Sequence, residues 1–194
     1  MPRDEASAAA ADDAELMLRL KDTQDEEALR ELVRRYQKPV FTMAYRMLGN
    51  TDEAEDLAQR TFIRLWKAAG SYKPTAKFST WLFTILRNLV FNETRRRTRK
   101  PTTSLEGCME QGIAPIPSTE QSPDTKLEEK ELQRAVDAAL AALPPDAAMA
   151  LHLRREQDMS YEEISRILDK SVPAVKSLLH RARRELRYRL RRYL

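Results

Sequence analysis

Two segments of the chain bring together side chains that could bind nucleic acid. The first, residues 72–97, combines aromatic, hydroxyl, amide and basic side chains around an apolar helix and a run of three arginines. Opening a DNA duplex costs roughly a few kcal/mol for each base that leaves the stack. A protein lowers this cost by holding the displaced strand on a basic track with apolar or aromatic surfaces. The candidate residues for this chemistry are Tyr72, Lys73, Lys77, Phe78, Ser79, Thr80, Trp81, Arg87, Asn88, Asn92, Arg95, Arg96 and Arg97.

The same segment allows two other interpretations. Residues 77–100 could form an amphipathic helix that lies on a membrane surface, or a core helix whose basic end is simply solvated. The apolar positions surround more of the helix than an interfacial stripe would, and Phe83, Ile85, Leu86 and Leu89 fit a protein core. We therefore interpret the segment as a core helix. Its N-terminal residues 77–80 would bind an extruded base, and the arginines at its C-terminal end would bind phosphates. Trp81 could belong to either the core or this base-binding group.

The second segment, residues 159–186, has the pattern of a DNA-binding helix-turn-helix. Ser160 and Glu163 predict a capping box at the start of one helix, and residues 169–171 predict a short turn. Ser171 is the N-cap candidate of a second helix, with Pro173 in its first turn, where a missing N–H costs nothing. The second helix of such a motif lies in the major groove. The candidate DNA contacts there are Ser171, Pro173, Ala174, Lys176, Ser177, His180, Arg181 and Arg184. The alternative is a plain helical hairpin with a basic outer face.

Basic charge is concentrated in these two segments. The formal net charge of the whole chain is only +4. Residues 176–192, however, hold eight basic side chains against Glu185 alone, and residues 87–100 hold six against Glu93. The rest of the chain is therefore acidic. Two basic patches on an acidic body predict a polyanionic partner.

The sequence contains no motif of a catalytic, metal or cofactor site. It has no glycine-rich phosphate loop, and one cysteine with two histidines cannot assemble a structural zinc site. The single Cys108 excludes an internal disulfide and fits a reducing compartment. No apolar run is long enough to span a membrane, and the N-terminal residues do not resemble a secretory signal. We therefore expect a cytoplasmic protein without enzymatic activity, metal or cofactor.

Glycine and proline positions divide the chain into two helical blocks. Residues 101–126 hold four of the ten prolines without apolar periodicity and predict a flexible linker. Helical periodicity fills residues 14–100 and 127–194, whereas residues 1–13 predict a disordered tail. In the first block, Pro39 should kink or interrupt a helix, Asn50 should cap the next one, and Ser79 could cap the last. The fold class is therefore all-α, with two small helical domains joined by a flexible linker.

Three stretches resemble the extracytoplasmic-function (ECF) sigma factors, the smallest sigma-70-type initiation subunits of bacterial RNA polymerase. These are residues 44–72, 77–97 and 159–186, which lie in the family's order across both blocks. The resemblance implies a σ2-like four-helix domain at 14–100 and a σ4-like helix-turn-helix domain at 127–194. It also implies that σ2 recognises and melts the −10 promoter element through the first candidate set. The σ4 domain would read the −35 element through the second.

The resemblance further implies that core RNA polymerase and promoter DNA are the partners. In this family, σ2 binds the clamp helices of the β′ subunit and σ4 binds the β flap, while many members are also held by an anti-sigma protein. The clamp-binding motif corresponds to Glu55, Asp56, Gln59, Arg60 and Phe62.

Three positions depart from the family pattern. Arg60 stands where an acidic residue is usual, and Ala174 and Leu178 stand where the recognition helix often has Thr and Arg. The alternative function is a stand-alone helix-turn-helix regulator, which would normally dimerise on a palindrome. The chain has no evident dimerisation heptad for that role.

Overall fold

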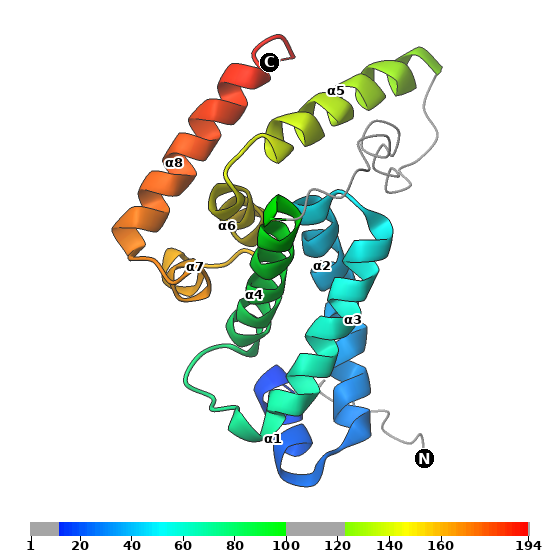
Figure 1. Cartoon of the computed structure of the whole chain (residues 1–194), viewed down its shortest axis with the longest axis vertical. Helices are drawn as coiled ribbons and strands as arrows, with labels where there is room; N and C mark the ends of the chain where they lie inside the picture. Colours follow the sequence, from blue (N-terminus) through cyan, green and yellow to red (C-terminus); the bar gives the residue numbers. More distant parts are fainter. Residues whose placement is uncertain (1–11, 100–122, 194) are drawn as a thin grey trace, which may run out of the picture.

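The computed structural model describes residues 12–99 and 123–193. All regular structure in these ranges is helical, which confirms the all-α prediction. The elements are α1 (Asp13–Thr23), α2 (Glu26–Leu48), α3 (Thr51–Ala68), the 3₁₀ turn η1 (Ala69–Ser71), α4 (Phe78–Arg99), α5 (Pro123–Ala141), α6 (Pro145–Glu156), α7 (Tyr161–Leu168) and α8 (Val172–Arg189) (Figure 1).

Helices α1 to α4 form one bundle, in which α2 contacts each of the other three. Each helix contributes an apolar stripe at helical spacing, as the periodicity predicted. The most deeply buried side chains include Met17, Leu32, Met43, Leu65 and Leu86, which are at most 2% exposed. Burial of these stripes stabilises the bundle, since each fully buried side chain contributes about 1.5–3 kcal/mol.

Local signals set the helix ends within this bundle. The Asn50 side chain accepts the N–H of Glu53 at 3.0 Å, so Asn50 caps α3 as predicted. Gly49 ends α2 in the left-handed region, with φ of 70°, where a side chain would be strained. Pro39 was predicted to kink or interrupt its helix, and the interruption is wrong, because α2 runs through the proline. Burial of Leu32, Val40 and Ala44 on both sides of the proline compensates for the missing hydrogen bond.

Helices α6, α7 and α8 form the second block, and α5 packs against α8. The predicted capping box is present, since Ser160 Oγ accepts the N–H of Glu163 and Glu163 Oε2 accepts the N–H of Ser160. Asp169 ends α7 in the left-handed region, and Ser171 then caps α8. These three local contacts build the helix-turn-helix.

The two blocks pack against each other. Helix α7 contacts α4, and α6 contacts α2, so that buried residues of both blocks form one apolar cluster. Figure 1 shows α7 beside α4, with α8 on the side of the second block that faces away from the first bundle. Most of the predicted linker, Cys108 and nearly all of the predicted tail lie outside the described residues, and helix α5 begins at Pro123.

Candidate nucleic-acid interface

The outer face of α8 is open to solvent along its whole length. Val175, Leu179 and Ala182 are at most 2% exposed and attach this helix to the rest of its block. The seven candidate contacts within the helix lie on its exposed surface, and Ser171 at the N-cap is exposed as well. The candidates are Ser171, Pro173, Ala174, Lys176, Ser177, His180, Arg181 and Arg184. The sequence pattern thus separated the buried face from the exposed face correctly.

Two contacts hold side chains in the N-terminal half of α8. The Lys176 ammonium lies 5.6 Å from the centre of the Tyr161 ring, a cation–π contact that directs the lysine along the surface of α7. Leu178 is partly buried and packs against two apolar clusters, the main core and a smaller one that includes Ala147 and Ala182. The leucine at this position therefore has a packing role, which accounts for the absence of a polar residue there.

The loop before α4 places its aromatic residues in the core. Tyr72 and Phe78 are at most 2% exposed, and Thr80 is 3% exposed. Tyr72 packs edge-on against Trp81 with ring centroids 5.3 Å apart, and Phe78 packs edge-on against Tyr36 at 5.2 Å. Burial also raises the pKa of the Tyr72 phenol. In this conformation these side chains support the loop and do not line an open pocket for a base.

Lys73, Lys77 and Ser79 are the polar candidates that the loop presents. Lys73 and Lys77 are exposed, and Ser79 is half-buried. The Lys21 ammonium donates to the carbonyl of Tyr72 at 3.0 Å, which holds the loop on α1. Helix α4 begins at Phe78, so Ser79 lies inside the helix and is not its cap. A basic loop, anchored to α1 by this hydrogen bond, therefore precedes α4.

One face of α4 carries the amide candidates. Asn88 and Asn92 are exposed and lie one helical turn apart. Arg87 is half-buried beside them, with its guanidinium 4.8 Å from the centre of the Phe91 ring. The opposite side of the helix is core, where Leu82, Phe83 and Leu89 are at most 1% exposed.

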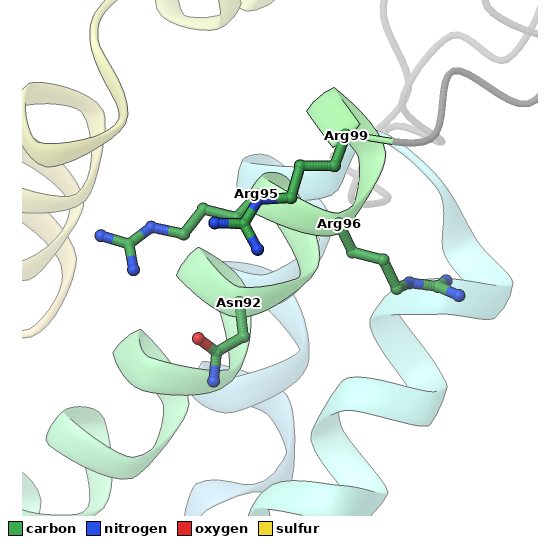
Figure 2. Close-up of a pocket in the computed structure, with 4 residues that line it drawn as sticks. All are labelled: Asn92, Arg95, Arg96 and Arg99. Atoms are coloured by element: carbon green, nitrogen blue, oxygen red, sulfur yellow. The ribbon is translucent and has the colours of Figure 1, made fainter.

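The arginine side chains at the C-terminal end of α4 point in different directions. Asn92, Arg95, Arg96 and Arg99 line an open hollow of about 300 Å³, and Arg95 and Arg96 extend to opposite sides of the helix (Figure 2). Arg96 pairs with Glu93 at 2.7 Å on the side of α3. Arg97 lies elsewhere, because it donates to the carbonyl of Leu48 at 2.9 Å and pairs with Glu53. In this structure Arg97 therefore ties α4 to α2 and α3.

The expected clamp-binding residues lie along α3. Glu55, Asp56 and Gln59 are exposed, and Arg60 pairs with Asp56 at 3.1 Å within the helix. Arg60, the departure from the family pattern, is thus partly neutralised by its own helix. Phe62 is half-buried and packs on the core.

Two exposed apolar side chains on α3 are absent from the predicted set. Ile63 is 51% exposed and Trp66 is 47% exposed, and they continue the exposed stripe of Gln59 by one and two turns. The apolar periodicity of α3 alone would place Trp66 on the buried stripe beside Leu65. A helical wheel centred between the buried Leu57 and Leu65 places Trp66 about 140° from that centre, on the exposed side, since each residue turns the helix by about 100°.

The membrane-surface interpretation of residues 77–100 finds no support. The apolar side chains of α4 are already buried against the other helices of the bundle. Within residues 12–99 and 123–193, no helix has the length and hydropathy needed to cross a bilayer. The basic end of α4 is therefore attached to a protein core.

An exposed recognition helix together with a second, basic helical bundle defines a DNA-binding transcription protein. Comparison with known proteins specifies the family. The model of Sigma-70 region 2 matches residues 32–100, and the model of Sigma-70 region 4 matches residues 133–186. The chain belongs to the sigma-70 family and, within it, to the ECF RNA polymerase sigma factors.

Named relatives support this assignment over most of the chain. The ECF RNA polymerase sigma factor SigW of Bacillus subtilis is 32% identical over 170 residues, which cover 86% of this chain and 91% of SigW. The ECF RNA polymerase sigma factor SigE of Mycolicibacterium smegmatis is 36% identical over 157 residues. That match covers 81% of this chain but only 59% of SigE.

Solved structures share the fold. The sigma factor RpoE of Bartonella quintana, crystallised with the anti-sigma factor NepR, matches with a TM-score of 0.64 and 26% identity. The match covers 84% of this chain and 96% of that one. CnrH, in complex with the cytosolic domain of CnrY, has the same TM-score at 23% identity, which shows the fold alone.

Proposed function

We propose that this sigma factor binds core RNA polymerase, reads a −35 element with α8 and opens the −10 element at the loop and outer face of α4. The observation that carries the proposal is the division of α8 into a buried apolar face and a fully exposed face with lysine, serine, histidine and arginine. Such a helix, capped at its N-terminus by Ser171 and preceded by a short turn, fits the major groove.

The groove contacts follow from side-chain chemistry. Lys176 and Arg181 can donate to guanine O6 and N7 or to phosphate, and Ser177 can contact either kind of group. Arg184 lies one turn further along and fits phosphate contact. Specificity would come from the first two turns, and affinity from the basic residues behind them.

We assign the contacts with the −10 element to the accessible side chains of α4 and of the loop that precedes it. Lys73, Lys77, Asn88, Asn92 and Arg95 are exposed, and Arg87 is half-buried. The buried Tyr72, Phe78 and Thr80 hold the loop in position, so a base would be received by its backbone and by Trp81 or Ser79, which are partly exposed. Phosphates of the displaced strand would bind to the basic end of α4.

The core-polymerase surface is the exposed stripe of α3. It joins the polar group of Glu55, Asp56 and Gln59 to the apolar pair of Ile63 and Trp66. A partly exposed tryptophan beside polar groups is typical of an interface anchor. We assign this stripe to the clamp helices of the β′ subunit, and α5 to α8 to the β flap. An anti-sigma protein is a further proposed partner.

In this role the chain directs a larger enzyme and contributes no catalytic residue of its own. It would act in the cytoplasm, where core polymerase and the chromosome meet. The test is to add the purified protein to core RNA polymerase with a library of promoter fragments and to sequence the transcripts. Transcripts that start at defined distances from shared upstream elements are expected. Random starts, together with no co-migration with core enzyme, would contradict the proposal.

A stand-alone regulator predicts a different result. A protein of that kind would bind a palindromic duplex without core polymerase, as a dimer. Analytical ultracentrifugation of the free protein on such duplexes separates the two functions. We expect a monomer with no stable complex on a palindrome.

A further inference from the structure

Helix α7 of the helix-turn-helix packs against α4, the helix that carries the proposed −10 contacts. Ile164, Ile167 and Leu168 of α7 are at most 1% exposed and belong to the same apolar cluster as Leu82 and Leu86 of α4. In Figure 1, α7 lies beside α4. The two blocks therefore share a core, and α7 covers part of a DNA-binding face.

A carboxylate of α7 binds the loop at the entry of α4. Glu163 accepts the N–H of Ser160 with one oxygen, at 2.7 Å, while its other oxygen lies 3.0 Å from Nζ of Lys77. Burial alone would raise the pKa of Glu163, but the hydrogen bonds from the Ser160 backbone and from Lys77 lower it below its ordinary value. The Lys77 side chain is 76% exposed, so this ion pair is weak and open to a competing anion.

The other end of α7 binds Arg87. Nη2 of Arg87 donates to the carbonyl of Leu168 at 3.2 Å. Leu168 is the last residue of α7, where carbonyls lack partners within the helix and a cation is favourable. In the described part of the chain, no carboxylate pairs with Arg87, whose other contacts are the Asn88 amide and the Phe91 ring. A phosphate would bind this guanidinium about twice as strongly as a neutral carbonyl does.

In this closed arrangement, α4 and α8 are too close together to bind the −10 and −35 elements at the same time. Positions −10 and −35 are about 25 base pairs apart, or about 85 Å along the duplex. In the structure, only residues 169–171 separate α7 from α8, and α8 itself is about 27 Å long. Residues 100–122, if fully extended, would allow the blocks to move apart by up to about 80 Å.

We propose that α7 is an intramolecular competitor of promoter DNA, which occupies Lys77 and Arg87 in the free protein and must leave before a single strand can bind them. This inference rests on the proposed function, since it takes both side chains as DNA contacts. The apolar surface buried by α7 favours the closed state. Two charge-assisted phosphate contacts favour the open one, so the balance depends on salt and on the charge of Glu163.

Zero-length cross-linking tests the contact in the full-length protein. A water-soluble carbodiimide activates the Glu163 carboxylate, and the deprotonated Lys77 amine displaces the activating group, which leaves as a urea while an amide bond forms. Peptide mass spectrometry measures the yield as a fluorescein-labelled single-stranded DNA of ~12 nucleotides is added. We expect the yield to fall in parallel with the rise in fluorescence anisotropy. Glu163→Gln cannot be activated and is the negative control.

The same variant tests the competition. Glu163→Gln retains a side-chain oxygen that can accept the N–H of Ser160, so α7 stays capped while the charge beside Lys77 is removed. We expect Glu163→Gln to bind the single strand about 1.5- to 5-fold more tightly. Glu162→Gln is the matched control, because it removes an equal charge from the same turn at an exposed position. Its effect should be smaller.

Three outcomes would contradict the proposed competition between α7 and DNA without contradicting the proposed function. These are no Lys77–Glu163 cross-link in the free protein, a cross-link that persists at saturating DNA, and equal effects of the two glutamate variants. If neither the free protein nor its complex with core polymerase binds the single strand, the proposed function fails, and the competition fails with it.

Discussion

Arg97 donates a hydrogen bond from Nη1 to the carbonyl oxygen of Leu48, at 2.9 Å, across the ends of α4 and α2. The third arginine of a basic run thus satisfies a carbonyl at the C-terminus of another helix, where a cation is also favoured by the helix dipole. Arg95, two residues earlier in the same run, is exposed and points away from α3 (Figure 2). Two arginines of the same run therefore have different roles.

The first prediction separates these two arginines. Arg97→Ala should lower the free energy of unfolding by about 1 kcal/mol, because it leaves the Leu48 carbonyl and Glu53 without this partner. Arg95→Ala should change it by less than about 0.5 kcal/mol. For DNA binding by the polymerase complex, Arg95→Ala should make the salt dependence shallower by about one released counterion. Urea unfolding and binding titrations at several salt concentrations measure both effects, and a reversed pattern would contradict the assignment.

The second prediction concerns the recognition helix. Arg181→Ala should weaken binding to duplexes that carry the −35 element by about 1–3 kcal/mol and relax the preference at one base pair if the contact is to a base edge. Arg189→Ala is the control, since Arg189 lies in the last turn of the same helix and pairs with Glu185 at 2.8 Å. Competition binding with single-base variants of the element distinguishes the two. Equal losses on all sequences would indicate that Arg181 contacts only phosphate.

The third prediction concerns the exposed stripe of α3. Trp66→Ala should weaken binding to core RNA polymerase about tenfold or more, as expected for an aromatic anchor, with little change in stability. Leu65→Ala, one residue away and fully buried, should instead destabilise the bundle by about 2–5 kcal/mol. Lys67→Ala, also exposed, is the control for an unspecific surface effect. Wild-type affinity of Trp66→Ala would remove this stripe from the polymerase interface.

The fourth prediction is a pH dependence within α2. Hydrogen bonds from Arg34 and Arg35 lower the pKa of Glu31 from 4.5 to about 2. Because the folded-state pKa lies below the unfolded value, the contribution of Glu31 to stability is present above pH 4.5 and is lost as the pH falls toward 2. Urea unfolding at pH 6 and pH 3 should therefore show a smaller difference for Glu31→Gln than for the wild type. Carboxyl carbon NMR gives the pKa directly, and a value near 4.5 would contradict the prediction.

Local patterns in the sequence were enough to predict most of the helices and their ends. Capping signals at Asn50, Ser160 and Ser171 depend on contacts within three residues, so they could be predicted without tertiary structure. The helical period likewise separated the buried and exposed faces of α8, because both follow from the rotation of the helix. The family resemblance rested on the sequences of residues 44–72, 77–97 and 159–186 and on their order along the chain.

Which polar and aromatic side chains remain accessible depends instead on tertiary packing. Tyr72, Phe78 and Thr80 suit a DNA-binding loop by type, yet α1, α2 and α4 enclose them, and no local pattern encodes that packing. The role of Arg97 depends on Leu48, far away in the chain. The contact between α7 and α4 depends on how the two blocks meet. Each of these outcomes is a long-range contact, so its free energy depends on the shape and position of a partner that periodicity along one helix does not specify.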